Sequence, residues 1–399
     1  MHICLVSLDF KPFRSSGLTI YAEDLARGLT EAGHRVTVLA ARRLNLPFHH
    51  WVEAIELYRV PIDRLDWISY SWRAAALLQV LQRSHSFDLV HFLDVHFAYA
   101  YHGQFVASIW QSFRQRLTAH QGGPYNTGSL DRLRRQVYYR TARRWMERVS
   151  LKRADRLIAS CRSTKQEFIS HYHVAADRID MAVQGIDTQL FQPMPTEDLR
   201  RQLGLVGCRI LLFVGFVTPR KGLAYLAQAM QLLPEDIHLL IVGVWGPGCR
   251  SRFVQALGKA SCRVHEIGYI ADELRPDYYS LADLYVSPSI LEGLGITPIE
   301  ALACQTPAVV TKATSGAEEV GESGVLVPPC DAKALAEAIM SLLSDPTRLT
   351  QLGQSGRDYV CRNFSYQRMT ELTLQSYDRV VAERSFHQQR FKSGEVNVG

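Results

Sequence analysis

Two glutamates and a glycine-rich turn stand close together in the stretch SPSILEGLGITPIEALA, which covers residues 287–303. Glu292 and Glu300 could each accept hydrogen bonds from hydroxyl groups, and Gly293 and Gly295 would let backbone N–H groups approach a ligand. A helix that begins near Pro298 would bring its N-terminus to the same place, where a phosphate is favoured. The stretch therefore predicts a site for a sugar joined to a phosphorylated nucleoside.

Two adjacent cations follow another glycine in the segment VGFVTPRKG, residues 214–222. Arg220 offers a planar fork of donors and Lys221 a point charge, so together they could hold a diphosphate. Their charge would also stabilise a nucleoside diphosphate as it departs. The alternative interpretation is a solvated basic turn.

The composition is that of an ordinary globular protein: 399 residues, 47% hydrophobic and 21% charged. This length favours two domains. A net charge of +6 suits an anionic ligand or a membrane surface and is too small to indicate nucleic acid by itself. The eight cysteines lack zinc-site spacing, so we expect reduced thiols, no metal and no cofactor.

Apolar runs that alternate with helical patterns predict an α/β protein with parallel sheets. The expected strands are 3–8, 36–40, 88–93, 104–109, 156–160, 209–214, 238–242, 263–268, 284–287 and 308–311. The pattern breaks at Pro193 and Pro195, a natural linker. We therefore expect two doubly wound, Rossmann-like domains, 1–193 and 194–365, with a cleft between them.

The end of the chain predicts one more helix and a polar segment. We expect a helix over 366–383 that packs back toward the N-terminal domain, followed by a flexible tail over 384–399.

The stretch Glu-Gly-Leu-Gly-Ile-Thr-Pro-Ile-Glu, with Ala282-Asp283 and Ser287-Pro288-Ser289 before it, resembles the signature of the retaining glycosyltransferases of family four. The resemblance extends over nearly the whole chain and is densest over 154–345. It implies the GT-B fold, in which two Rossmann-like domains enclose a cleft, and transfer of a sugar from a nucleoside diphosphate sugar to a hydroxyl acceptor. A lipid, a natural product or a glycan could be that acceptor.

The resemblance also implies roles for individual residues. Glu292 would contact the donor sugar and Glu300 the ribose hydroxyls, while Arg220 and Lys221 would hold the leaving diphosphate. Phe216 stands where relatives carry an arginine, which suggests that Arg220 supplies the missing charge. The remaining expected donor-binding positions are Gly17, Gly215, Tyr269, Ile270, Gly293, Gly295, Ile296 and Thr297.

The first domain departs from the family pattern at one point. Where many relatives carry a histidine near the reacting carbon, this chain has Trp110 and Gln111. Gln111 can bond a sugar hydroxyl but cannot act as an acid or base. Asp94 and His96, after the strand 88–93, are further candidates to contact the acceptor.

A basic stretch precedes the strand 156–160. Residues 132–156 hold ten Lys or Arg residues and two acids, Glu147 and Asp155. A helix over 132–153 could touch an anionic acceptor or anionic lipid headgroups, although such faces are usually only solvated. We accordingly expect a cytoplasmic protein with peripheral contact at the inner membrane face as one option.

Three other functions stay open. A GT-B phosphorylase and a sugar-nucleotide epimerase are two of them, although the paired-glutamate turn favours transfer. The third is a non-catalytic partner protein that keeps the fold and the donor cleft. A nicotinamide dehydrogenase would need a Gly-x-Gly-x-x-Gly loop after the first strand, and the loop from Asp9 to Gly17 lacks it.

Overall fold

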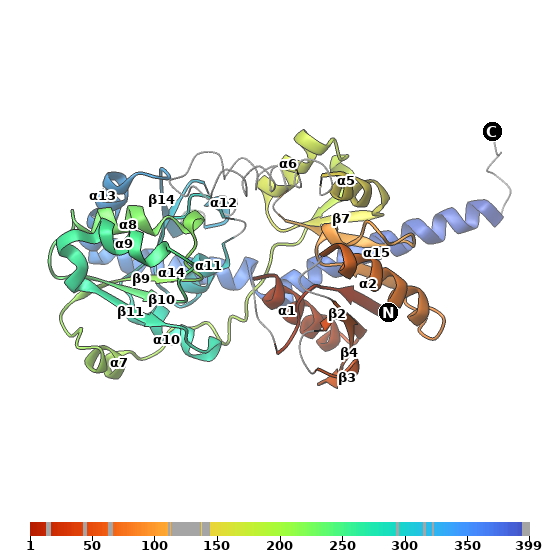
Figure 1. Cartoon of the computed structure of the whole chain (residues 1–399), viewed down its shortest axis with the longest axis horizontal. Helices are drawn as coiled ribbons and strands as arrows, with labels where there is room; N and C mark the ends of the chain where they lie inside the picture. Colours follow the sequence, from red (N-terminus) through yellow and green to blue (C-terminus); the bar gives the residue numbers. More distant parts are fainter. Residues whose placement is uncertain are drawn as a thin grey trace. The chain divides into compact units, whose positions relative to one another are not determined.

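The computed structural model consists of two compact α/β units (Figure 1). It describes residues 1–12, 17–42, 46–62, 67–110, 112, 137, 144–292, 295–313, 317–320 and 323–392. The first unit comprises the described residues of Met1–Arg114 and Leu130–Gly185, together with those from Tyr366 onward. The second unit comprises the described residues of Ile186–Ser365.

The first unit is an eight-stranded sheet. Its strands are β1 (His2–Val6), β2 (Arg35–Arg42), β3 (His49–Val52), β4 (Ile55–Pro61), β5 (Leu89–Phe92), β6 (Val106–Ile109), β7 (Arg156–Ala159) and β8 (Ile179–Met181). They lie in the order β3-β4-β2-β1-β5-β6-β7-β8, all parallel except the antiparallel pair of β3 and β4. Strand order reverses between β1 and β5, as in doubly wound folds.

Helices cover both faces of this sheet, and short 3-10 turns join some of the strands. They are α1 (Gly17–Glu31), α2 (Trp67–Leu81), η1 (Val95–Phe97), α5 (Arg144–Arg153), α6 (Arg162–Tyr172), η3 (Ala176–Arg178) and α15 (Tyr366–Lys392). Side chains of α2 and α6 form one core with alternate residues of β1, and those of α1 and α15 form the other. Such burial on both faces explains the continuous apolar runs in the strands.

The second unit is a six-stranded parallel sheet with the order β11-β10-β9-β12-β13-β14. Its strands are β9 (Arg209–Val214), β10 (Ile237–Val242), β11 (Val264–Gly268), β12 (Leu284–Ser287), β13 (Ala308–Thr311) and β14 (Gly324–Val327). This is the 3-2-1-4-5-6 order of the Rossmann fold, and it reverses between β9 and β12.

Helices precede, connect and follow these strands. They are α7 (Glu197–Gln202), η4 (Pro219–Lys221), α8 (Leu223–Met230), α9 (Cys249–Leu257), η5 (Gly258–Arg263), η6 (Asp272–Leu274), α10 (Arg275–Leu281), α11 (Ile296–Ala303), α12 (Ala317–Val320), α13 (Ala332–Leu343) and α14 (Pro346–Asn363). Helices α8, α9 and α13 share one core with the sheet.

The border between the units differs from the predicted one. It lies at Gly185 and Ile186 rather than at 193 and 194. The reason is Phe191, whose ring lies 6.1 Å from the ring of Tyr279 and whose carbonyl accepts a hydrogen bond from Arg357 at 3.1 Å. These contacts tie the segment before the prolines to the second unit.

Helix α15 is longer than the sequence predicted. It continues to Lys392, so the part of the expected tail that the structure describes is helical (Figure 1). The helix packs against α1, where Tyr366 donates a hydrogen bond to Glu31 at 2.9 Å and the Arg27 guanidinium lies over the Tyr366 ring. Farther along, Glu383 pairs with Arg156 at 2.8 Å.

Gly28 sets how closely α1 and α15 approach. A Cβ at this position would lie 2.0 Å from Oγ1 and 3.0 Å from Cβ of Thr370. We predict that Gly28→Ala lowers the free energy of unfolding by about 1–3 kcal/mol because the contact becomes overpacked. Urea denaturation measures this change in the free energy of unfolding.

Gly17→Ala is the matched control, because a Cβ there meets no atom within 4 Å. It should leave the unfolding midpoint nearly unchanged. Equal midpoints for both variants would show that the contact with Thr370 does not limit the packing of α15.

Candidate active site

The topology of the second sheet brings two predicted segments together. Strands β9 and β12 are neighbours at the point where the strand order reverses. Turn η4, which carries Arg220 and Lys221, follows β9, and the loop that carries Glu292 follows β12. Open α/β sheets bind ligands outside the carboxyl ends of strands at such a point, so this is the candidate site.

Arg220 and Lys221 both pair with Glu292. Nη1 of Arg220 lies 2.8 Å from Oε1 of Glu292, and Nζ of Lys221 contacts Oε2. The backbone amide of Ile290 also donates to the carbonyl oxygen of Arg220 at 2.7 Å. With two cations and one carboxylate, the cluster keeps one positive charge in excess, which attracts an anion.

The two cations differ in exposure, and they control the ionisation of Glu292. Lys221 is buried, whereas the Arg220 side chain is 44% exposed and stays accessible. Burial alone would raise the pKa of Glu292, but the charges of Lys221 and Arg220 outweigh it and hold that pKa below its usual value. Glu292 is therefore a carboxylate over the whole physiological pH range.

Gly222 allows the two connections to approach. Its φ is +68°, and a Cβ there would lie 2.0 Å from the carbonyl oxygen of Pro288. Any other residue would push η4 away from the loop after β12. The sequence shows this glycine directly after Lys221, yet nothing in the sequence alone tells that Pro288 lies against it.

Three neighbouring strands end in the same way, each with a glycine of positive φ followed by an exposed apolar residue. The pairs are Gly215 and Phe216 after β9, Gly243 and Val244 after β10, and Gly268 and Tyr269 at the end of β11. Tyr269 is 75% exposed, and Ile270 beside it is partly exposed. Together they offer an apolar surface suited to a planar ring.

The N-terminus of α11 lies in the connection after β12. Gly295 caps it with a φ of +72°, and Ile296 and Thr297 are its first residues. The first N–H groups of a helix have no partner within the helix, so they can bind an anion. The Tyr285 hydroxyl donates to Oγ1 of Thr297 at 2.8 Å and fixes that residue. Gly293 lies outside the described residues.

Glu300 is placed differently from the other predicted residues. It is 1% exposed and lies in α11, where Nη1 of Arg275 donates to both of its oxygens at 2.9 and 3.0 Å. The Tyr279 hydroxyl adds a bond of 2.6 Å to Oε2. Burial raises the pKa of Glu300, which Arg275 and Tyr279 oppose. Glu300 therefore joins α10 to α11, a structural role that its spacing in the sequence did not reveal.

In the first unit, the predicted acceptor residues Asp94 and His96 are buried together after β5. Asp94 accepts hydrogen bonds from the backbone amide and from Nδ1 of His96. On its other side, Nε2 of His96 lies 3.0 Å from Oε1 of Glu147 on α5, whose Oε2 accepts from the Tyr172 hydroxyl. The group thus holds α5 and α6 against the sheet.

His96 carries a charge in this setting. Burial alone would lower the pKa of His96, but Asp94 and Glu147 raise it to about 9. By contrast, His91 in β5 bonds Tyr377 at 2.6 Å and Ser108 at 2.9 Å, and burial lowers its pKa to about 3. His91 is therefore a neutral core residue.

Trp110 is one of the two residues that stand where many relatives carry a histidine, and in this structure it is a packing residue. Its indole N–H donates to the carbonyl of Leu93 at 2.7 Å, and its ring meets Tyr21 edge to face. Gln111 lies outside the described residues. Gly17 begins α1, and its carbonyl accepts a hydrogen bond from Gln184 at 3.1 Å. A Cβ at this position would meet no atom within 4 Å. The expected approach of Gly17 to the donor therefore stays a prediction.

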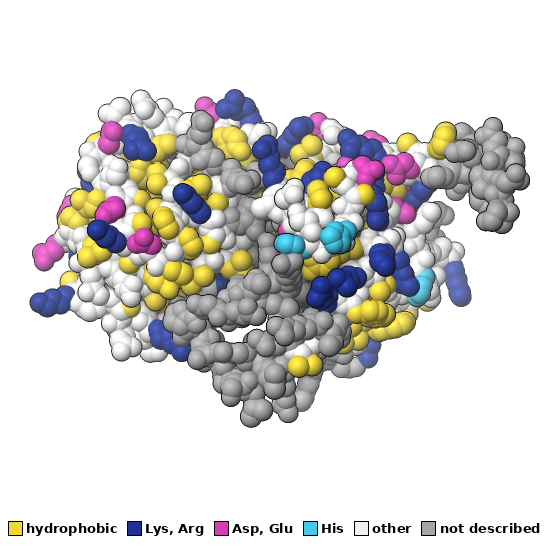
Figure 2. Space-filling view, turned by 90° about the horizontal axis from the view of Figure 1, so that it is seen from above, with side chains coloured by type: hydrophobic (Ala, Val, Ile, Leu, Met, Phe, Trp, Pro, Cys, Tyr) yellow, Lys and Arg dark blue, Asp and Glu magenta, His cyan; other side chains and the backbone are white. Residues whose placement is uncertain are grey.

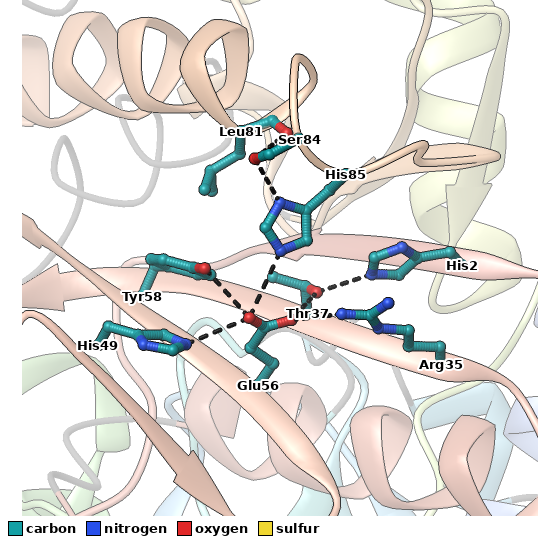
Figure 3. Close-up of polar contacts among 9 residues, drawn as sticks. All are labelled: His2, Arg35, Thr37, His49, Glu56, Tyr58, Leu81, Ser84 and His85. Carbon is teal, nitrogen blue, oxygen red and sulfur yellow. Dashed lines mark hydrogen bonds and ion pairs between the residues drawn. The ribbon is translucent and has the colours of Figure 1, made fainter.

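A second polar cluster surrounds Glu56 at the opposite, amino ends of the strands (Figure 3). Its carboxylate accepts bonds from Arg35 at 3.2 Å and Tyr58 at 3.0 Å, and it contacts His49 and His85. Burial alone would raise the pKa of Glu56, but these donors lower it. The cluster ties β2, β3 and the segment after α2 to β4, and the sequence patterns did not point to it.

Among the residues that the structure describes, no group of three or more His, Cys, Asp or Glu side chains is arranged to hold a metal ion. The positive charge at the carboxyl ends of β9 and β12 comes from Arg220 and Lys221.

Glu300→Ala should lower the free energy of unfolding by about 3 kcal/mol, because it removes the hydrogen bonds that this buried carboxylate accepts from Arg275 and Tyr279. Asp272 still pairs with Arg275 in the variant. Guanidinium denaturation measures the change. Tyr279→Phe is the matched control: it removes one hydrogen bond to the same carboxylate and should cost about 2 kcal/mol. A Glu300→Ala protein as stable as the wild type would contradict the structural role.

The charge of His96 predicts a dependence of stability on pH. Its pKa rises from 6.5 in the unfolded chain to about 9 in the fold, so its stabilising effect is full below pH 6.5 and lost as pH rises through about 9. The difference in unfolding free energy between wild type and His96→Gln should therefore shrink from pH 6.5 to pH 9.5. His171→Gln, at an exposed position, is the control; a difference that does not vary with pH would refute a charged His96.

Two family models match the chain. The description "Glycosyltransferase Family 4" matches residues 15–190, and "Glycosyl transferases group 1" matches residues 195–359. Alpha-maltose-1-phosphate synthase of Mycolicibacterium smegmatis is 33% identical over 263 residues, 60% of this chain and 66% of that protein. A D-inositol 3-phosphate glycosyltransferase of Arthrobacter is 31% identical over 57% of this chain and 56% of its own length. The chain thus aligns with just over half to about two thirds of these relatives' lengths.

Solved structures share the fold over almost the entire chain. Sucrose-phosphate synthase of Thermosynechococcus elongatus superposes with a TM-score of 0.78 at 24% identity, covering 96% of this chain and 99% of that one. HepE of Anabaena, solved in complex with UDP, superposes with a TM-score of 0.73 at 18% identity, covering 95% and 100%. The two Rossmann-like sheets, the cluster of Arg220, Lys221 and Glu292 between β9 and β12, and the family matches over both units agree: this chain belongs to the glycosyltransferases of family four and has the GT-B fold.

Proposed function

We propose that this chain transfers a sugar from a nucleoside diphosphate sugar to a hydroxyl acceptor, with retention of configuration. The observation that supports the proposal most strongly is the cluster of Arg220, Lys221 and Glu292 at the point where the strand order reverses. It sets two cations beside one carboxylate and a helix N-terminus. A diphosphate needs positive charge, and a sugar needs hydrogen-bond acceptors.

The charge that develops on the leaving group determines which residues can lower the barrier to transfer. When the bond between the anomeric carbon and the diphosphate oxygen breaks, negative charge grows on the diphosphate. Arg220, Lys221 and the amides of Ile296 and Thr297 would stabilise that charge more strongly than they stabilise the intact donor, which lowers the barrier. Arg220 would supply the charge that an arginine at the position of Phe216 supplies in relatives.

Glu292 would orient the donor sugar by accepting bonds from its hydroxyls, since its depressed pKa keeps it ionised. The acceptor oxygen would then attack on the face from which the diphosphate leaves, and its proton would pass to a diphosphate oxygen. Because the new bond to the acceptor forms on the same face of the sugar as the broken bond to the diphosphate, the configuration would be retained. NMR of the product's anomeric proton tests this point.

The nucleoside would lie on the apolar surface at the ends of β9, β10 and β11, beside Tyr269 and Ile270. A carboxylate has about four acceptor positions, and Arg275 and Tyr279 use three of those on Glu300. We propose that a ribose hydroxyl takes the remaining one. HepE of Anabaena, whose structure was solved in complex with UDP, supports a nucleoside diphosphate donor by analogy.

The names of two relatives point to acceptors that carry hydroxyl groups, one a maltose 1-phosphate synthase and the other an inositol 3-phosphate glycosyltransferase. These names support a hydroxyl acceptor here and leave its class to experiment.

Lys221→Ala should lower kcat about 100-fold with a smaller change in KM, because Lys221 would act chiefly on the charge of the transition state. Arg220→Ala should act in the same direction. The measurement is release of nucleoside diphosphate from UDP-, GDP-, ADP- and dTDP-sugars in the presence of a panel of hydroxyl acceptors.

Lys259→Ala, which removes an exposed lysine of the second unit away from Glu292, is the matched control and should keep full turnover. Unchanged turnover in Lys221→Ala would refute its assigned role. No release with any donor would favour a non-catalytic protein, and formation of a sugar 1-phosphate from a glycan and inorganic phosphate would favour a phosphorylase.

A further inference from the structure

Two tryptophans of the first unit are exposed on neighbouring helices. Trp72 on α2 is 57% exposed and Trp145 on α5 is 60% exposed. Both meet the buried ring of Tyr99 edge to face, at centroid distances of 6.3 and 6.4 Å. Burying an indole ring is strongly favourable, so two of them in water around one tyrosine mark an interaction surface.

The exposed face of α2 continues this apolar surface. Trp72, Ala76 and Val80 are four residues apart, so they lie on one side of the helix, and all three are exposed. Val80 is 59% exposed. The helix contains no acidic residue, and its single charged residue is Arg73.

Helix α5 adds positive charge beside Trp145. Arg144, Arg148 and Lys152 are exposed, and the helix has one acid, Glu147. That acid is fully buried, where it bonds His96. The outer face of α5 therefore presents cations without a compensating carboxylate of its own.

The surface is held rigidly. Arg153 donates to the carbonyl oxygen of Tyr99 at 3.0 Å, and the Tyr99 hydroxyl donates to that of Ile68 on α2 at 3.2 Å. The contact between His96 and Glu147 holds the buried side of α5 in place. Figure 2 shows basic and hydrophobic side chains next to one another on the visible face of this unit.

We propose that this tryptophan face, made of Trp72, Ala76, Val80, Trp145, Arg144, Arg148 and Lys152, docks on a bilayer of anionic phospholipid. Tryptophan is favoured at the boundary between headgroups and acyl chains, and each nearby Arg or Lys gains from the negative surface. Val80 favours lipid over nucleic acid, because an aliphatic side chain gains from burial among acyl chains and nothing from base stacking. No described helix is long and apolar enough to cross a membrane, so the contact would be peripheral.

Flotation with vesicles tests the proposal. The full chain should float with vesicles of phosphatidylcholine that contain phosphatidylglycerol and remain behind with phosphatidylcholine alone. Trp72→Ala with Trp145→Ala should lower the partition coefficient more than tenfold. Arg144→Glu with Arg148→Glu should do the same through charge. Tryptophan fluorescence should be quenched by brominated lipid in the wild type and much less in the tryptophan double variant.

Matched controls distinguish binding through this face from non-specific hydrophobic and electrostatic binding. Trp51→Ala removes another tryptophan of the first unit, 55% exposed on β3, and Lys259→Glu with Lys333→Glu makes the same charge change in the second unit. Both should bind vesicles like the wild type. A wild type that does not float, equal binding by all variants, or stronger binding to a DNA duplex than to anionic vesicles would overturn the proposal.

Discussion

The pairing of Lys221 with Glu292 joins the two connections that leave the second sheet where its strand order reverses. Each connection could move freely if it were alone. The ion pair, the bond from Ile290 to Arg220 and the contact of Gly222 with Pro288 hold them in one geometry. Because the cluster keeps an excess of one positive charge, this geometry also creates a place for an anion. The proposed donor site follows from that constraint.

Much of this arrangement could be predicted from the sequence. Continuous apolar runs give the strands of parallel sheets, since both faces are covered. The segments VTPRKG and LEGLGITPIE each follow an expected strand, and open α/β sheets bind ligands at the carboxyl ends of their strands. That these two strands are neighbours is seen in the structure. The structure adds the direct contact of Arg220 and Lys221 with Glu292. This contact depends on the backbone conformations of two connections that are distant in sequence.

Other parts could not be predicted, for physical reasons. The edge strand β3 and its neighbour β4 were missed because polar and charged residues, among them His49 and Glu56, interrupt them. They lack the continuous apolar run by which the other strands were identified. Asp94 and His96 looked like ligand contacts since they follow a strand, yet their partners Glu147 and Tyr172 come from helices far along the chain. Glu300 likewise owes its burial to Arg275 and Tyr279. Tertiary pairing decides whether a polar residue serves structure or ligand.

Equilibrium binding of free nucleoside diphosphates tests the central claim most directly. Titration calorimetry of UDP, GDP, ADP and dTDP, each with its monophosphate, should find one diphosphate that binds and a monophosphate that binds much more weakly. Lys221→Ala should weaken binding of the diphosphate at least tenfold and leave binding of the monophosphate nearly unchanged, since in the proposed donor site the lost charge would face the second phosphate. Binding of the diphosphate with equal affinity in wild type and variant would contradict the account.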